Sequence, residues 1–172
     1  MATGICSWRK AAILGGFLAL GLTGCSAKEP ATISLSGIVY NYSQDSLATV
    51  KINGKTAGTA MSKVVPGDVS GGGVMCCFKL PENAKEVEVE IQSSSGDYKI
   101  TAQIEKWWPD LAHYGVVHIL PGRKVVMELR SVYTWPRRDL LESQLSALGI
   151  KKVINYSGPM NEGPMERTDG VK

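Results

Sequence analysis

The sequence predicts a mainly β protein, an antiparallel β-sandwich of about seven to eight strands with one C-terminal helix. Short apolar or alternating segments recur along the chain, and turn-forming residues separate them roughly every 8–12 residues, which is typical of sandwiches and barrels. The apolar spacing becomes helical only after Trp135-Pro136. The chain has 172 residues, which is enough for one such domain with a substantial core.

Eight segments carry the strand pattern. They cover residues 33–40, 47–52, 55–61, 74–80, 86–91, 98–104, 115–120 and 124–133. Asn53-Gly54 supplies the two-residue turn of a tight hairpin, and Pro121-Gly122 fits the centre of a type II turn. Glu86, Glu88 and Glu90 alternate with apolar residues, so we interpret them as the solvent face of a strand rather than as a metal site.

A glycine-rich segment precedes two neighbouring cysteines. Residues 62–73 are expected to form a loop that ends in Gly71-Gly72-Gly73 and leads into a buried central strand, which Pro81 ends. Within that strand Cys76 and Cys77 would point to opposite faces, so buried free thiols and a strained vicinal disulfide remain equal alternatives. Both cysteines are expected to support folding. No CxxC or HxxxH spacing accompanies them, so no metal site is predicted.

The first 24 residues predict a bacterial lipoprotein signal peptide. Arg9 and Lys10 precede an apolar run over residues 11–22, which has signal-peptide length and is too short to span a bilayer. The run ends in Leu22-Thr23-Gly24-Cys25, a lipobox pattern in which the cysteine is lipidated and becomes the first mature residue. We therefore predict lipidation of Cys25, with an ordinary secretory signal as the alternative.

The mature chain is predicted to lie at the cell envelope. Ser26 follows the lipidated cysteine, which favours the periplasmic face of the outer membrane over the inner membrane. The membrane is therefore one expected partner, through the N-terminal lipid anchor. Loss of Arg9 and Lys10 reduces the 19 basic residues to 17, against 16 acidic ones. This balance lacks the basic field of nucleic-acid-binding proteins, and no cofactor or small-molecule substrate is expected.

The C-terminal part predicts a helix over residues 139–149. Asp139 and Glu142 have the spacing of a capping pair, and Gly149 suits the position after the last turn. The helix is expected to cover an open end or edge of the sheet with one apolar stripe, formed by Leu141, Leu145 and Leu148. The chain after it is polar and rich in Gly and Pro, which is typical of disorder. The predicted organisation is signal peptide 1–24, tether 25–31, domain 32–154 and disordered tail 155–172.

The chain is not expected to be an enzyme. Its two histidines are His113, in a loop with a solvated or capping role, and His118, which we interpret as a hydrogen-bonded structural residue of an apolar strand. A Cys77–His118 pair on adjacent strands is conceivable. However, the sequence has no recognisable motif for an oxyanion hole, such as GxSxG.

Binding to a protein partner is the remaining hypothesis. Aromatic residues stand at several strand ends. Each one could simply fill the end of the hydrophobic core, but Trp, Tyr and Arg also dominate binding hot spots. Glycine backbone allows a partner to approach closely, and the guanidinium groups of Arg137 and Arg138 suit carboxylates. The candidate partner-binding residues are Asp68, Ser70, Gly71, Gly72, Gly73, Trp107, Trp108, Trp135, Arg137 and Arg138.

Several short motifs follow one another between residues 35 and 140, in this order: Tyr40-Asn41-Tyr42, Val50-Lys51-Ile52-Asn53-Gly54, Gly71-Gly72-Gly73 before Cys76-Cys77, Leu80-Pro81, Val117-His118-Ile119-Leu120-Pro121-Gly122 and Trp135-Pro136. Together they resemble a bacterial lipoprotein family labelled domain of unknown function 3304. The stretch around Trp107-Trp108 departs from the family pattern.

Members of that family are similar to immunity lipoproteins encoded beside type VI secretion lipase effectors. The resemblance implies a periplasm-facing immunity lipoprotein that binds and sterically inhibits a cognate secreted phospholipase or lipase. The alternative is an envelope structural or assembly lipoprotein that binds another envelope component.

Overall fold

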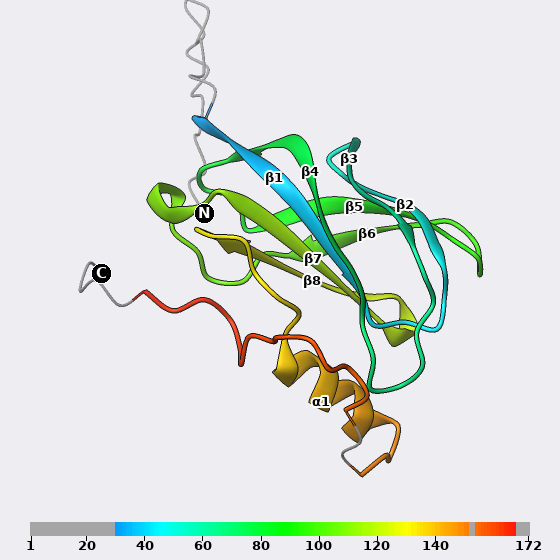
Figure 1. Ribbon diagram of the computed structural model, residues 1–172. Helices are drawn as coiled ribbons and strands as arrows, with labels where there is room; N and C mark the ends of the chain where they lie inside the picture. The colour runs from blue at the N-terminus through cyan, green and yellow to red at the C-terminus, as the bar shows by residue number, and fades with distance from the viewer. Residues whose placement is uncertain (1–29, 152–153, 168–172) are drawn as a thin grey trace, which may run out of the picture.

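The computed structural model describes residues 30–151 and 154–167, which form eight strands and one α-helix (Figure 1). The elements are β1 Thr32–Asn41, β2 Leu47–Ile52, β3 Lys55–Met61, β4 Ser70–Pro81, β5 Glu86–Ser93, β6 Tyr98–Gln103, β7 Tyr114–Leu120, β8 Lys124–Arg130 and α1 Arg138–Ala147, with short 3-10 turns at Pro109–Leu111 and Pro121–Arg123. The predicted mainly β sandwich is confirmed. The predicted signal peptide and Cys25 lie outside the described residues.

The strands form two stacked four-stranded sheets, with the orders β4-β1-β7-β8 and β3-β2-β5-β6. Neighbouring strands are antiparallel, as predicted, except that β1 and β7 are parallel. Parallel neighbours need a long crossover connection. Here the connection from β1 to β7 contains β4 and all four strands of the second sheet. An alternating apolar pattern does not show which distant strand pairs with a given strand, or whether the pair is parallel or antiparallel.

The main core lies between the sheets. Val87, Val89 and Ile91 point into it from β5, as the alternation predicts, while Glu88 and Glu90 on the other face bind Lys99 of β6. The sheets approach closely at two glycines. A Cβ atom on Gly37 would lie 2.7 Å from the Cβ of Ala57, and one on Gly58 would lie 2.7 Å from Cγ2 of Val39. Any larger residue at these positions would push the sheets apart.

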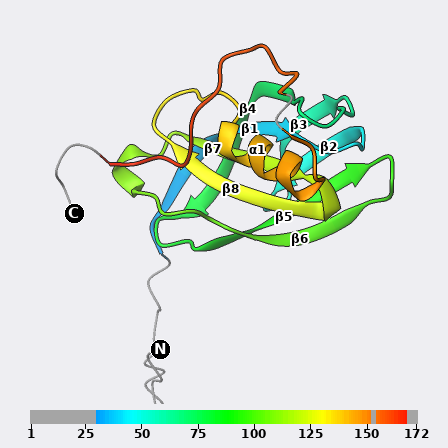
Figure 2. The same cartoon turned by 90° about the horizontal axis from the view of Figure 1, so that it is seen from below.

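A third layer covers the outer face of the β4-β1-β7-β8 sheet. In Figure 2, α1 lies across β7 and β8. A second apolar cluster fills this interface, and it consists of Ile38, Tyr40, Tyr42, Val69, Val116, Leu120 and Leu141, with Leu140, Ile154, Tyr156 and Met160 at its margin. The helix therefore covers a sheet face rather than the end or edge that the sequence predicts.

The helix spans 138–147 instead of the predicted 139–149. Arg137 is its N-cap residue and makes no side-chain cap, so the expected capping role of Asp139 is wrong. Gly149 does end the helix, with φ +69° and its N–H donating to the carbonyl of Ser146. Of the predicted apolar stripe, Leu141 and Leu145 are buried, whereas Leu148 is 49% exposed.

The segment after the helix also differs from the prediction. Residues 154–167 contain no helix or strand, yet they are attached to the sandwich and are not a disordered tail. The backbone of Asn155 donates to the carbonyl of Gly67, and Asn161 exchanges backbone hydrogen bonds with Pro136 and Arg138. Polar composition indicates disorder only when a segment makes no tertiary contacts, and these contacts come from residues far away in the sequence. Within the described residues, no helix has the length and apolar character to cross a membrane.

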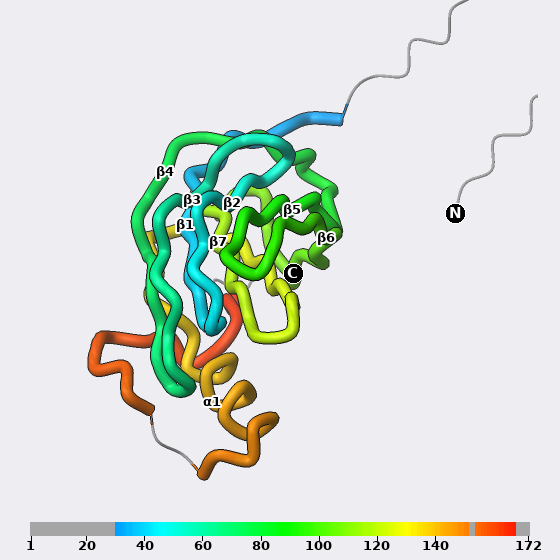
Figure 3. The backbone as a smooth tube through the Cα atoms, turned by 90° about the vertical axis from the view of Figure 1, so that its right-hand side faces the viewer, coloured from blue at the N-terminus to red at the C-terminus, as the bar shows by residue number. Residues whose placement is uncertain are grey.

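The strand with the two cysteines, β4, is an edge strand and not the buried central strand that the sequence predicts. It also begins at Ser70, so the three glycines belong to the strand rather than to the preceding loop. Pro81 ends it, as predicted. In Figure 3, β4 and β3 lie side by side at one margin of the molecule, where the two sheets meet.

Candidate functional site

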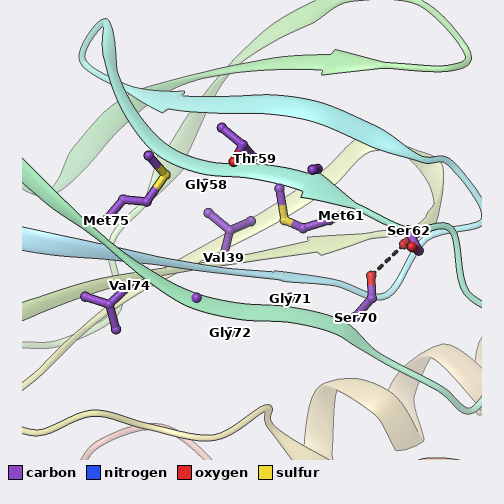
Figure 4. A pocket seen from close by; sticks show the side chains of 12 residues that line it. Val39, Gly58, Thr59, Met61, Ser62, Ser70, Gly71, Gly72, Val74 and Met75 are labelled. Carbon is purple, nitrogen blue, oxygen red and sulfur yellow. Dashed lines mark hydrogen bonds between the residues drawn. The ribbon is translucent and has the colours of Figure 1, made fainter.

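A groove lies between the two edge strands β3 and β4 (Figure 4). Its volume is about 350 Å³. The walls are the backbones of Gly58–Ser62 on β3 and Ser70–Met75 on β4, and Val39 of β1 lies between them. The groove is closed at one end by Ser70, whose hydroxyl donates to the carbonyl of Ser62 at 2.5 Å. The groove therefore presents mostly backbone and small side chains.

The glycines shape this edge through a β-bulge. The pairing of β4 with β1 shifts between Gly71, opposite Tyr40, and Val74, opposite Ile38, so Gly72 and Gly73 stand against the single residue Val39. Gly71 and Gly72 have φ angles of +111° and +95°, which other residues rarely adopt. A Cβ on Gly73 would meet no atom within 4 Å. Gly73 is therefore an exposed position with space for a partner to approach.

Two aromatic residues from the segment after β8 lie next to the glycines of β4 but outside the lining of the groove. The Tyr133 hydroxyl donates to the carbonyl of Gly72 at 2.9 Å. The Tyr133 and Trp135 rings meet edge to face, with centroids 5.2 Å apart. They are 38% and 43% exposed, and the neighbouring Val74 is 49% exposed. We call Ser70–Met75, Tyr133 and Trp135 the edge surface.

The structure thus brings together part of the predicted binding set. Ser70, Gly71, Gly72, Gly73 and Trp135 all belong to the edge surface. Asp68 lies just before it, half-buried, and accepts a hydrogen bond from the backbone N–H of Val69. Tyr133 was not predicted as a binding residue. The only signal in the sequence was its place near Trp135 at the end of a strand, which also fits a core plug.

Trp107 and Trp108 lie at the other end of the sandwich. The indole N–H of Trp107 donates to the carbonyl of Ala84, next to the end of β4 and the start of β1. Along β1, Thr32 at that end and Tyr40 beside the glycines are eight residues apart, or about 26 Å. Both tryptophans are half-buried. One partner surface therefore cannot include them together with the edge surface unless the partner spans the length of the domain.

Arg137 is not available to a partner, contrary to the prediction. It is 2% exposed and binds three carboxylates. Its guanidinium lies 2.5 Å from Glu105, 3.5 Å from Glu128 and 2.6 Å from Asp139. These ion pairs hold the pKa of Arg137 above its ordinary value against the lowering effect of burial. Arg138 is half-buried and binds the exposed Glu162 at 3.1 Å.

Glu128 connects Arg137 to a buried polar network. One carboxylate oxygen lies 3.0 Å from Nε2 of His118, and the other accepts a hydrogen bond from Arg130 at 2.8 Å. Nδ1 of His118 shares a hydrogen bond with the Tyr42 hydroxyl at 3.0 Å, and that hydroxyl accepts from the backbone N–H of Arg137 at 2.8 Å. His118 is fully buried. The predicted hydrogen bonding of this residue within an apolar strand is confirmed.

The network perturbs the ionisation of its members. Burial raises the pKa of the Glu128 carboxyl, but the hydrogen bonds with His118 and Arg130 and the positive charge of Arg130 lower it more, so the net pKa lies below the ordinary value. Burial also raises the pKa of Tyr42 and of Tyr40, which stacks on His118. Tyr40 donates to the carbonyl of Thr134 at 2.7 Å. This network therefore fastens the segment 134–139 to the sheet.

Cys76 and Cys77 form a disulfide with each other, which resolves the two alternatives. They occupy a second bulge of β4, where both residues stand opposite the single residue Ser36. Their side chains are exposed, because the bulge lies on an edge strand. The conceivable Cys77–His118 pair does not form: β1 separates β4 from β7, and both ring nitrogens of His118 have other partners.

Among the residues that the structure describes, no group of three or more His, Cys, Asp or Glu side chains has a geometry that could hold a metal ion. The predicted binding set did not include the β3 wall of the groove. It also lacked the two methionines that line the groove, Met61 of β3 and Met75 of β4. Only the sheet order makes them neighbours of the glycines.

Comparison of the chain with protein-family models, with curated proteins and with solved structures gives no match. The resemblance to the lipoprotein family therefore stays a prediction.

Proposed function

We propose that this chain is a periplasm-facing immunity lipoprotein that binds a cognate secreted lipase through the edge surface and blocks it sterically. One observation carries the choice of surface. The hydrogen bond from Tyr133 to Gly72 unites the glycine-rich strand with Trp135 in a single exposed area, although these segments are about sixty residues apart in the chain. The lipase itself is implied by the family resemblance.

The chemistry of the edge surface supports recognition of a protein. Tyr and Trp provide large contact area with few rotatable bonds, and they are enriched among residues that dominate binding energy. Beside them, Gly73 leaves the backbone of an edge strand uncovered. A partner can therefore place its own backbone against β4 and bury the two rings. Such a contact needs no chemistry from this chain, and occupation of the lipase entrance or lid is sufficient for inhibition.

The predicted lipid on Cys25 supports the same proposal. A lipase in the periplasm acts on envelope lipid, and an anchored inhibitor is confined to the same surface. Confinement raises the effective concentration of the inhibitor without any additional contact. A soluble inhibitor of equal affinity would need a higher copy number for the same protection.

The experiment is a protection assay. A lipase encoded beside the gene of this chain is exported to the periplasm of test cells, with or without the chain, and survival is counted. We expect the parent chain to protect the cells and Tyr133→Ala/Trp135→Ala to lose protection. Leu148→Ala is the matched control, because Leu148 is also exposed and apolar but lies at the end of α1.

Immunoblots of membrane fractions establish that all variants are present in equal amounts. Absence of protection by the parent chain contradicts the proposal and favours the alternative, an envelope structural or assembly lipoprotein. Protection that survives the double substitution retains the function but moves the contact to another surface.

A further inference from the structure

The start of the described chain lies beside one end of the sandwich. The carbonyl of Ala31 accepts a hydrogen bond from the backbone N–H of Glu82 at 2.9 Å, and Thr32 pairs with Pro81. In Figure 1, the blue start of β1 lies at this end, at the opposite end of the strand from the one beside the β4 glycines. Cys25 precedes Thr32 by seven residues, which reach at most about 25 Å when fully extended. A lipid on Cys25 therefore keeps this end of the domain close to the bilayer.

Trp107 attaches a loop to the same end. Its indole N–H donates to the carbonyl of Ala84 at 3.0 Å, and its ring packs at the margin of the main core. The next residue, Trp108, has two cations near its ring. The ammonium of Lys106 is 5.3 Å from the centre of the Trp108 ring, and the guanidinium carbon of Arg167 is 6.0 Å from it. The C-terminal segment and the loop thus meet around one tryptophan.

Charged side chains of both signs lie at this end. The exposed lysines are Lys79, Lys85 and Lys106. The acidic residues are Glu82, Glu86 and Asp110, of which Asp110 is held by both guanidinium nitrogens of Arg167 at 2.9 and 3.1 Å. Glu86 accepts a hydrogen bond from Gln103. A tryptophan among basic side chains is the composition that favours the boundary between water and anionic headgroups.

We propose that this end of the sandwich, formed by Pro30–Thr32, Pro81–Lys85 and Lys106–Asp110, docks on the lipid surface with Trp108 at the headgroup level. The proposal rests on the lipid anchor of the proposed function and is independent of the toxin. Its consequence is an orientation. The strands then rise from the membrane, and the glycines of the edge surface stand about 26 Å along β1 from the docked end. A partner at the edge surface would be held above the bilayer.

The test uses the processed, lipidated protein in vesicles of phosphatidylethanolamine and phosphatidylglycerol whose acyl chains carry bromine. Bromine quenches tryptophan fluorescence only at short range. We expect quenching in the parent, loss of most of it in Trp108→Phe, and no loss in the matched variant Trp135→Phe, since Trp135 lies on the edge surface. Replacement of phosphatidylglycerol by phosphatidylcholine, or Lys85→Glu/Lys106→Glu, is expected to reduce the quenching of the parent.

Flotation of the same vesicles separates the two proposals. Protein that floats without quenching overturns the docked orientation but leaves the anchor intact, as does quenching that disappears in Trp135→Phe instead. Protein that does not float contradicts the anchor and the orientation together. If Trp108 contacts a protein partner or a second copy of the chain instead of lipid, brominated lipid does not quench it, and the docking proposal is wrong.

Discussion

The hydroxyl of Tyr133 donates a hydrogen bond to the carbonyl of Gly72 at 2.9 Å, across 61 positions of sequence. Gly72 lies in the bulge of an edge strand, and Tyr133 lies in the segment that leads from β8 to α1. The bond fixes the direction of the Tyr133 ring, and the Tyr133 ring in turn contacts Trp135. The orientation of the exposed tryptophan therefore depends on a strand that neither local pattern nor spacing connects to it.

Tyr133→Phe is expected to keep the ring and remove this hydrogen bond. The free energy of unfolding should fall by about 0.5–1.5 kcal/mol, the usual net contribution of one hydrogen bond, and towards the lower limit because water can reach the Gly72 carbonyl. Urea denaturation measures the change. A decrease well above this range would mean that Tyr133 also supports the core.

Gly71→Ala is expected to destabilise the fold, whereas Gly73→Ala is not. Gly71 has φ +111°, and a Cβ there would overlap the carbonyl oxygen of Val39. The expected loss is about 1–3 kcal/mol. At Gly73 the space is open, so alanine should leave stability unchanged or raise it by up to about 1 kcal/mol, because the unfolded chain loses freedom. Thermal denaturation of both variants checks the difference. In a flexible loop, the two substitutions would have equal effects.

Arg137→Ala is expected to lower the free energy of unfolding by about 1–3 kcal/mol, because Glu105, Glu128 and Asp139 each lose a charged hydrogen-bond partner. Glu128 keeps its bond to Arg130. Arg138→Ala is the adjacent control. Its partner Glu162 is exposed, and such surface pairs contribute about 0–1 kcal/mol. Chemical denaturation of the two variants checks the difference. Similar stability of both variants would contradict the buried network and restore Arg137 as a candidate contact residue.

Stability is expected to decrease at acidic pH. The folded pKa of Glu128 lies below its ordinary value, as does that of Asp139. For Asp139, burial raises the pKa but the hydrogen bond and charge of Arg137 lower it more. A carboxyl with a lowered folded pKa stabilises the native state above its unfolded pKa. That contribution is lost as pH falls through the folded pKa.

Urea denaturation at a series of pH values should therefore show a falling free energy of unfolding once the pH drops below 4.5, the ordinary Glu value. Glu128→Gln should flatten this dependence, even if the variant is less stable throughout. A parent curve that is flat between neutral pH and the onset of acid unfolding would show that these carboxyls are not held by the network.

Cys76→Ser/Cys77→Ser is expected to change the free energy of unfolding by about 0.5 kcal/mol or less, as for other exposed substitutions. The disulfide joins adjacent residues, so it closes almost no loop and hardly restricts the unfolded chain. This revises the expectation that both cysteines support folding, because they lie exposed on an edge strand. A thiol assay of the denatured, unreduced protein should detect neither cysteine. A large loss of stability, or free thiols, would contradict the exposed disulfide.

Local features determined much of this fold. The strand expected over residues 55–61 is β3, Lys55–Met61. Asn53 and Gly54 have φ angles of +47° and +73°, as the two-residue turn requires. Pro81 ends β4, and Gly149 ends the helix. These predictions succeeded because each depends only on the backbone preferences of a few neighbouring residues.

The candidate site, in contrast, was decided by tertiary structure. An uncharged run such as 74–78 fits a central strand and an edge strand equally well. Only the order β4-β1-β7-β8 makes it an edge and leaves Val74, Cys76 and Cys77 exposed. Arg137 and Arg138 are adjacent and chemically alike in the sequence. Arg137 is buried in ion pairs with Glu105, which precedes β7, and with Glu128 of β8. Neither carboxylate is near Arg137 in the sequence pattern.

The sequence by itself thus determined which segments are strands, where they turn and which side chains face a core. Tertiary structure decided which strands are edges, that Tyr133 links Gly72 to Trp135, and that the tryptophan pair at 107–108 lies beside the start of β1. The physical reason is the range of the interactions involved. Backbone preferences and apolar alternation act between near neighbours, whereas edges, grooves and buried ion pairs arise from contacts between segments that the chain brings together only when the two sheets stack.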